Sequence, residues 1–194
     1  MSALKNRQPG WLNYFRPNIF VNSIADINIS NFKQQGFRMV ICDLDNTLVP
    51  HFTKIPTQQA IDFVKNIQKQ GLLFIVVSNN TKKRVTEFCK ILKPNDYVYN
   101  AKKPLTNKVK KIMHKYNVSN EDIIFIGDQV VTDVWVSNRL QCKSILTLPI
   151  VSSSKEKNGW LLRLLDNYIY KYLQHNNMLN NKEELEIEDK YEIL

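Results

Sequence analysis

Short apolar runs alternate along this chain with longer segments whose apolar residues recur at helical spacing. Buried strands are expected over five of these runs, at residues 38–43, 72–78, 97–100, 123–127 and 144–148. The intervening helices are expected at residues 57–70, 82–92, 105–116 and 132–140. Connections of this length join parallel strands through right-handed helical crossovers. The alternation therefore predicts an α/β fold built on a parallel sheet of about five strands.

The length of 194 residues suits one domain with short flanking segments. We expect an N-terminal extension over 1–37 that packs on the domain, a core over 38–150, an amphipathic helix within 151–181 and an acidic mobile tail over 182–194. The three cysteines and three histidines are scattered, which argues against a disulfide framework, a zinc knuckle or a histidine-based metal motif. No apolar run approaches the roughly 20 residues that cross a bilayer, and the N-terminus lacks the apolar core of a signal peptide, so we expect a cytoplasmic protein.

The charge is unevenly distributed. The last thirteen residues hold six acids and two bases, whereas the preceding 181 residues carry 25 bases and 12 acids, a net charge of +13. A body this basic favours an anionic partner, which is nucleic acid, an anionic lipid surface or a phosphorylated substrate. A compositional bias toward Lys, Asn and Ile explains the charge equally well, so the charge alone does not select among these partners.

Two aspartates follow the first predicted strand, in the run VICDLDNTLVP. Ligands of such sheets bind outside the carboxyl ends of the strands, which makes these positions candidates for chemistry. Asp43 is our candidate nucleophile for attack on phosphorus, and Asp45 is the candidate general acid and base. Thr47 is expected to orient the nucleophile and to contact the phosphate. Two neighbouring aspartates without other site residues are also common as turn formers or helix caps. The catalytic assignment therefore depends on the further motifs described in the next paragraphs.

Several carboxylates and a dianionic substrate repel one another, so the site needs a cation, and Mg²⁺ prefers hard oxygen ligands. The expected ligands are Asp43, the backbone carbonyl of Asp45 and, after the fourth strand, Asp128. Asp133 follows five residues later and is expected behind the ligands, where it orients them; its alternative role is to start a helix.

Three further residues follow the second and third strands and are expected to bind the phosphate. Lys103 would supply positive charge, and Ser78 would donate a hydrogen bond. Asn79 is expected beside them in the pocket. The alternative for Lys103 is an ordinary exposed surface lysine. The alternative for Ser78 is a hydrogen-bonding residue at the end of a strand, without contact to phosphate.

The segments DLDNT, VVSNN, AKKP and GDQVVTD resemble, in order and spacing, the four motifs of the haloacid dehalogenase-like (HAD) phosphohydrolase superfamily. The resemblance spans about residues 38–148. It implies a three-layer Rossmann-like fold and Mg²⁺-dependent phosphate ester hydrolysis through an aspartyl-phosphate on Asp43. In that pattern the lysine directly before proline, here Lys103, is the functional one. The short spacing between motifs leaves no room for a cap domain, and an open site suits a bulky substrate.

A narrower resemblance includes the lead-in to DLDNT, the long GDQVVTDVWVSNRL and the following TLPIV, and it is to the YqeG-type branch of subclass III. That branch is similar to the mitochondrial phosphatidylglycerophosphate phosphatases, which implies phosphatidylglycerophosphate as substrate and phosphatidylglycerol as product. Aromatic and basic residues within 5–20 and 160–172 suit peripheral contact with an anionic membrane at its inner face. Alternatively, these two segments pack on the domain as ordinary amphipathic helices.

Two other functions stay open at this point. One is a phosphatase for a soluble or protein-bound phosphate. The other is a protein without catalytic activity that binds a membrane or nucleic acid on the same fold.

Overall fold

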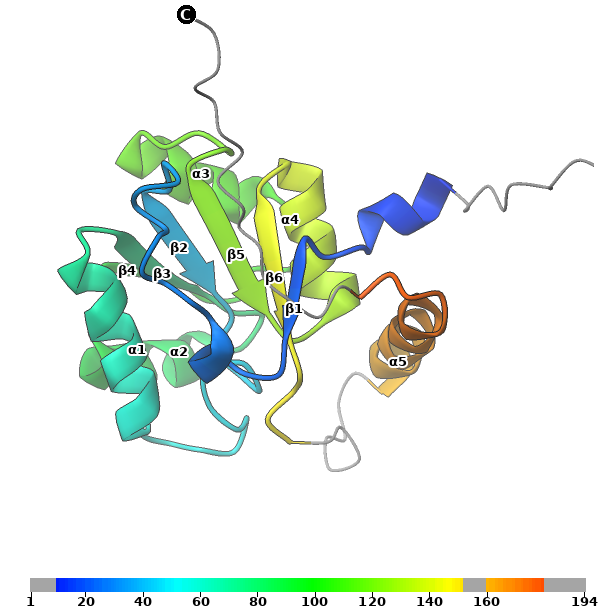
Figure 1. Ribbon diagram of the computed structural model, residues 1–194. Coiled ribbons are helices and arrows are strands. Elements are labelled where there is room, and N and C mark those ends of the chain that lie inside the picture. The colour runs from blue at the N-terminus through cyan, green and yellow to red at the C-terminus, as the bar shows by residue number, and fades with distance from the viewer. Residues whose placement is uncertain (1–9, 152–159, 180–194) are drawn as a thin grey trace, which may run out of the picture.

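The structure is a computed structural model that describes residues 10–151 and 160–179. Its centre is a six-stranded parallel sheet in the order β1-β6-β5-β2-β3-β4 (Figure 1). The strands are β1 (Ile19–Val21), β2 (Met39–Cys42), β3 (Leu73–Val77), β4 (Asp96–Val98), β5 (Ile123–Gly127) and β6 (Lys143–Thr147). The five predicted runs thus form β2 to β6, and the predicted parallel α/β sheet is confirmed.

The sixth strand, β1, comes from the segment that we expected to be an N-terminal extension, and it was not predicted. Its three residues are too short a run to stand out in the sequence. β1 pairs in parallel with β6, with Ile19 opposite Ile145. The side chain of Asn18 accepts a hydrogen bond from the Ser144 N–H at 2.8 Å, and the Asn18 N–H donates to the Ser144 hydroxyl at 3.0 Å. These two hydrogen bonds fix the register of β1, which is too short to fix it through its own pairing.

The helices lie close to the predicted ranges. They are α1 (Gln58–Lys69), α2 (Lys82–Leu92), α3 (Asn107–Tyr116), α4 (Trp135–Leu140) and α5 (Trp160–His175), with short turns at η1 (Gly10–Tyr14), η2 (Ile24–Asp26) and η3 (Val130–Val134). Thr57 and Thr81 cap α1 and α2 by accepting hydrogen bonds from backbone N–H groups of the first turn. The range 132–140 was expected to be one helix. It is instead divided between the π-helical turn η3 and the helix α4.

Helices cover both faces of the sheet, which gives three layers. On one face, α1 and α2 pack their buried side chains, among them Phe63 and Phe88, against Val40 and Phe74 of the sheet. On the other face, side chains of α3 and α4 pack against Met39, Ile41 and Phe125. Between residues 10 and 151 each connection between successive strands holds at most one α-helix besides loops and short turns, so this part of the chain carries no cap domain.

Helix α5 lies beside the β1 and β6 edge of the sheet (Figure 1). Its buried residues Ile169 and Leu173 join a cluster with Leu12, Phe20 and Val131. The segment around Leu12, helix α5 and the turn η3 are thereby held together. Among the described residues, no helix has the length and apolar character needed to cross a membrane.

The strand order reverses between β2 and β5, the two central neighbours. The chain runs from β2 outward through β3 to β4, and then returns to the opposite side of β2 to form β5. The loops that follow these strands meet at one edge of the sheet, where ligands of such folds bind. The predicted boundaries at 1–37 and 151–181 fall partly on residues outside the described ranges, and the predicted acidic tail at 182–194 falls wholly outside them. These domain boundaries therefore stay predictions.

Candidate active site

Asp43 and Asp128 begin the loops after the two central strands. Cys42 at the end of β2 pairs with Ile126 of β5, and the Asp43 N–H donates to the Ile126 carbonyl at 2.9 Å. Leu44, between the two aspartates of the first motif, is fully buried in the core. The hydrogen bonds between β2 and β5 therefore extend as far as Asp43. Because Leu44 points into the core, the acidic residues on either side of it point toward the open edge of the sheet.

Lys103 joins two aspartates that come from different loops. Its Nζ lies 2.6 Å from Asp43 Oδ1 and 2.6 Å from Asp133 Oδ1. All three residues are buried. Buried ion pairs of this kind fix the geometry of their partners, and removal of one partner leaves an uncompensated buried charge.

The fourth-motif loop is fixed by two further contacts. The Thr47 hydroxyl donates to Asp128 Oδ1 at 2.8 Å, and the Gln129 N–H donates to Asp133 Oδ2 at 3.1 Å. Asp133 can approach the backbone this closely because residue 127 is glycine: a Cβ at Gly127 would lie 2.3 Å from Asp133 Cγ. Glycine is thus required here for close approach.

Asp43, Asp128 and Asp133 form one buried acidic group. Ligand oxygens from the three carboxylates lie within 4.8 Å of one another. Among the described residues, Lys103 is the one buried lysine and it faces three carboxylates, so negative charge exceeds positive charge in this group. Hard carboxylate oxygens in such a group suit a divalent cation such as Mg²⁺, and the residues present therefore fit the predicted metal. Asp133 lies in the group itself, but both of its oxygens already accept hydrogen bonds, which fits an orienting role.

The pKa values of these groups reflect their burial first and then the charges of their neighbours. Burial raises the pKa of Asp43 to about 7, against the opposing effect of Lys103. Burial and then the charge of Asp43 raise the pKa of Asp128 well above its ordinary value. For Lys103, burial alone would lower the pKa, but Asp133 and Asp43 outweigh it and raise the pKa above its usual range. A bound divalent cation would favour the ionised carboxylates and lower their pKa values again.

The predicted phosphate-binding residues after β3 lie next to Lys103. Ser78 is buried, and its hydroxyl accepts a hydrogen bond from the Asn80 N–H at 3.1 Å. The Asn79 side chain accepts from the Lys103 N–H at 2.7 Å and donates to the Lys103 carbonyl at 3.2 Å. Asn79 therefore holds the backbone of the lysine, a positioning contact that the sequence alone did not suggest.

Asp45 lies apart from the buried acidic group. Its Oδ1 accepts from Arg84 Nη2 at 2.9 Å and Nε at 3.3 Å, and its Oδ2 accepts from Asn80 Nδ2 at 2.9 Å. Both Asp45 and Arg84 keep 16% of their side-chain surface exposed, so this pair meets solvent. The carboxylate is thus kept outside the acidic group, which leaves only the backbone carbonyl of Asp45 for the metal role that we predicted.

Sequence reasoning missed three residues that contact the site loops. Arg84 and Asn80 bind Asp45, and Asp166 of α5 accepts a hydrogen bond from the Val131 N–H in η3 at 2.8 Å. Burial raises the pKa of Asp166 to about 7. In the sequence, Arg84 sits in a run of basic residues that looks like a solvated helix face, and Asp166 looks like one polar residue of an amphipathic helix.

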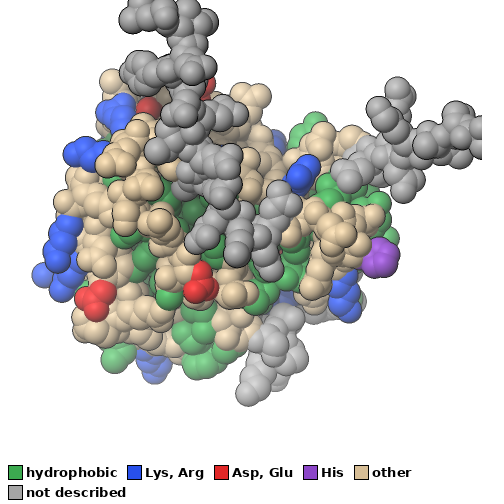
Figure 2. Space-filling view, in the orientation of Figure 1, with side chains coloured by type: hydrophobic (Ala, Val, Ile, Leu, Met, Phe, Trp, Pro, Cys, Tyr) green, Lys and Arg blue, Asp and Glu red, His purple; other side chains and the backbone are tan. Residues whose placement is uncertain are grey.

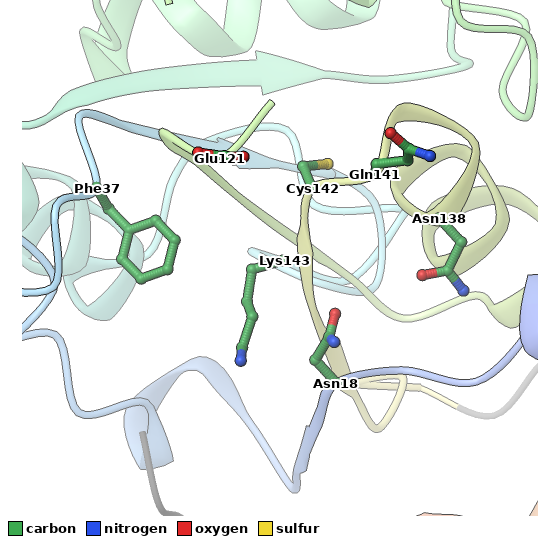
Figure 3. A pocket seen from close by; sticks show the side chains of 7 residues that line it. All are labelled: Asn18, Phe37, Glu121, Asn138, Gln141, Cys142 and Lys143. Carbon is green, nitrogen blue, oxygen red and sulfur yellow. The ribbon is translucent and has the colours of Figure 1, made fainter. Parts of the chain in front are cut away.

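The opposite edge of the sheet has a hollow of about 400 Å³ (Figure 3). Its lining comes from segments that precede strands, including Phe37 before β2, Glu121 before β5 and Cys142 before β6. None of the predicted site residues lines it. The chemistry-bearing groups are therefore gathered at the carboxyl edge, as in other sheets of this kind.

Comparison with known proteins identifies the family. The sequence profile of the family described as mitochondrial PGP phosphatase matches residues 11–151. A relative from Bacillus subtilis (strain 168), named probable phosphatase YqeG, is 33% identical over 140 residues, which are 72% of this chain and 81% of the relative. The crystal structure of a hypothetical protein from Xanthomonas campestris shares the fold, with a TM-score of 0.51 and 12% identity, over 74% of this chain and 79% of that one.

The family match starts within the N-terminal segment that supplies β1 and ends just after β6, so it includes the whole sheet and every predicted site residue. The resemblance seen in the sequence is confirmed. The chain belongs to the mitochondrial PGP phosphatase family and is a HAD-type phosphatase related to YqeG, that is, a phosphoric monoester hydrolase.

Proposed function

We propose that the protein hydrolyses a phosphate monoester with Mg²⁺, through an aspartyl-phosphate on Asp43. The observation that carries this proposal is the buried group of Asp43, Lys103, Asp128 and Asp133 at the carboxyl edge of the central strands. It combines a carboxylate nucleophile, a cation for the phosphate and oxygen ligands for a metal.

In the first step, an Asp43 oxygen attacks phosphorus, and the bond between phosphorus and the leaving oxygen breaks. Asp45 donates a proton to that oxygen, so the alcohol leaves as a neutral molecule. Lys103 and Ser78 contact the phosphoryl oxygens, whose negative charge must be offset during transfer.

In the second step, water attacks the aspartyl-phosphate. Asp45 takes a proton from this water, the bond between phosphorus and the Asp43 oxygen breaks, and inorganic phosphate leaves. Asp43 returns to a free carboxylate, and Asp45 is again protonated for the next cycle.

Asp43 and Asp128, with the backbone carbonyl of Asp45, would hold the Mg²⁺. When bound, the ion supplies positive charge that reduces the repulsion between the phosphate and the carboxylates. The orientation of its ligands depends on Thr47 and Asp133, whose hydrogen bonds are described above.

The test uses the purified full chain with an aryl phosphate, with and without MgCl₂. We expect phosphate release only with the metal, and an Asp43→Asn variant should lose at least about 10³-fold in kcat because no other described group replaces the nucleophile. Thermal unfolding gives a second readout: MgCl₂ should stabilise the wild type by about 2.7 kcal/mol at 100 times its Kd. An Asp128→Asn variant should lose that stabilisation, whereas Asp62→Asn on the exposed face of α1 should keep it. Equal turnover by wild type and Asp43→Asn would refute the nucleophile.

For the substrate, we propose phosphatidylglycerophosphate, with phosphatidylglycerol as the product. The family description supports this choice, because it names PGP phosphatases. A site without a cap domain also leaves space for a bulky lipid head group, which the open carboxyl edge would accept directly.

The surface around this edge supports peripheral contact with an anionic lipid surface. The loop after β2 exposes 63% of Phe52 and 63% of Ile55, with the exposed Lys54 between them. On α5, Leu164 and Tyr168 are exposed on the side opposite its buried residues. Figure 2 shows hydrophobic side chains reaching the surface along the lower edge of the molecule, with Lys or Arg side chains nearby. Apolar side chains next to basic ones are typical of interfacial binding. The proposed location is the cytoplasm, at the inner face of the membrane.

Two measurements test the substrate and the contact. Phosphate release from phosphatidylglycerophosphate in mixed micelles should exceed release from a soluble alkyl phosphate by at least about 10-fold in kcat/KM, and cells depleted of the protein should accumulate this lipid. Vesicles with phosphatidylglycerol should sediment the protein, and vesicles of phosphatidylcholine alone should not. A preference for a soluble ester would instead support the alternative of a phosphatase for small or protein-bound phosphates.

A further inference from the structure

The carboxylate of Asp45 is fixed from both sides by residues that the proposed reaction does not otherwise use. Two guanidinium nitrogens of Arg84 bind Oδ1, and Asn80 binds Oδ2. Arg84 lies 39 residues from Asp45 in the sequence and belongs to the first turn of α2. Helix α2 therefore determines where the carboxylate lies, in addition to the loop that carries it.

Three contacts hold Arg84 in place. The helix cap at Thr81 accepts a hydrogen bond from the Arg84 N–H, the guanidinium lies 5.0 Å from the centre of the buried Phe88 ring, and Nη1 donates to the Thr53 carbonyl. Stacking on an aromatic face and a planar fork of donors restrict an arginine side chain to one geometry. Arg84 is thus rigid enough to position another group.

Asp45 needs such a partner because of its neighbours. The charge of Asp45 acts on Asp43 of the acidic group and raises the pKa of Asp43, and like charges repel one another without directing the repelled group to a defined place. Asp45 is also only partly buried, so packing does not fix its side chain. Proton transfer depends strongly on geometry, and a misplacement of about 1 Å costs on the order of 10²-fold in rate.

We propose that Arg84 is a positioning residue that holds Asp45 where it can transfer its proton to the leaving oxygen. This inference depends on the proposed function, and specifically on Asp45 as the general acid. Arg84 touches neither the phosphoryl group nor the metal in this role, so its whole effect on the reaction passes through Asp45. Asn80 supports the same carboxylate from its other oxygen.

The experiment compares two esters that differ in their need for an acid. An alkyl phosphate requires protonation of its leaving oxygen, whereas p-nitrophenyl phosphate releases a stable anion and requires little. We expect Arg84→Gln to lower kcat/KM by about 10²-fold on the alkyl ester and by less than about 5-fold on the aryl ester. Asp45→Asn should show the same pattern. The double variant should be no worse than Asp45→Asn alone, because both changes remove one function.

Control variants separate positioning from general damage. Lys83→Gln removes the same charge from the neighbouring exposed position of α2 and should retain wild-type kinetics on both esters. Arg84→Lys keeps the charge but loses the fork and should recover part of the alkyl activity. Denaturant unfolding of each variant should show a folded protein.

Five outcomes would overturn the proposal. Equal losses on both esters in Arg84→Gln, or further loss in the double variant, would mean that Arg84 acts on the substrate or the fold. A rise in activity in Arg84→Gln would make the pair an inhibitory latch, which also overturns the proposal. If the wild type hydrolyses neither ester, the proposed function and this inference fail together. If Asp43→Asn is inactive while Arg84→Gln is unchanged, only this inference fails.

Discussion

The site has two parts with opposite properties. The buried part contains Asp43, Asp128 and Asp133 around one lysine, so its negative charge exceeds its positive charge. The outer part contains Asp45, which is matched by the charge of Arg84 and keeps contact with solvent. In the proposed mechanism the first part would hold an added cation, and Asp45 in the second part would donate and accept a proton. The difference shows that two aspartates separated by one residue can lie in different electrostatic environments, because different side chains contact them.

The largest effect is expected from a substitution that disrupts the ion pairs of the buried part. Lys103→Met leaves Asp43 and Asp133 without their cation, which should cost about 3–5 kcal/mol of unfolding free energy at pH 7 in metal-free buffer and abolish activity. The deficit should shrink toward pH 5, because Asp43, whose pKa is raised by burial to about 7, becomes protonated and its need for the lysine is lost. Urea unfolding at both pH values measures it. Lys102→Met, at the exposed neighbouring position, should be close to neutral.

The second prediction probes how tightly the buried part is packed. Gly127→Ala places a methyl group into the Asp133 carboxylate, so the loop must shift, at a cost of about 1–3 kcal/mol and with reduced activity. Gly10→Ala is the matched control, since nothing lies within 4 Å of its added Cβ. Equal stability of the two variants in urea would show that the loop from Gly127 to Asp133 adjusts freely, and would contradict a rigid buried part.

The smallest expected effect concerns Asp166 of α5, a partly buried carboxylate that accepts a hydrogen bond from the Val131 N–H. The pKa of Asp166 is raised by burial to about 7, so the folded state binds this proton more tightly than the unfolded state between pH 4 and 7. Stability from this group must therefore fall as pH rises through that window.

Asp166→Asn removes this titration and keeps an acceptor for the Val131 N–H. The variant should gain about 1 kcal/mol over the wild type by pH 7.5, and the gain should vanish near pH 4. Urea unfolding across this pH range measures the difference, with Asp62→Asn on the surface as the control. A gain that does not depend on pH would contradict the assigned cause.

The sequence predicted the buried part well and the outer part poorly. Asp43, Lys103 and Asp128 each follow an apolar run, so parallel pairing alone brings them to one edge. Their catalytic roles stay predictions, whereas the family, the fold and the phosphatase class are confirmed. Arg84 follows Thr81 inside a helix, and its meeting with Asp45 depends on how α2 rotates and packs on Phe88. Such tertiary placement leaves no periodic pattern along the chain.

The same limit explains the strand β1 and the helix α5. β1 is identified by its partner and not by its composition, because three apolar residues between two asparagines have no distinctive period. The amphipathic pattern predicted α5, but its contact through Asp166 joins two segments 35 residues apart. Local patterns thus predict which elements form, and long-range contacts decide which side chains meet.

The pairing of β1 with β6 has a consequence for how the chain folds. Asn18 and Ser144 are 126 residues apart, so the first strand of the sheet can only pair after the last one has been synthesised. Contacts of such sequence separation form late and slowly, because the loop must close before they contribute. Until then, the outer edge of β6 lacks its partner strand. On the ribosome, this newly made edge is where the nascent protein is most exposed to pairing with a neighbouring chain.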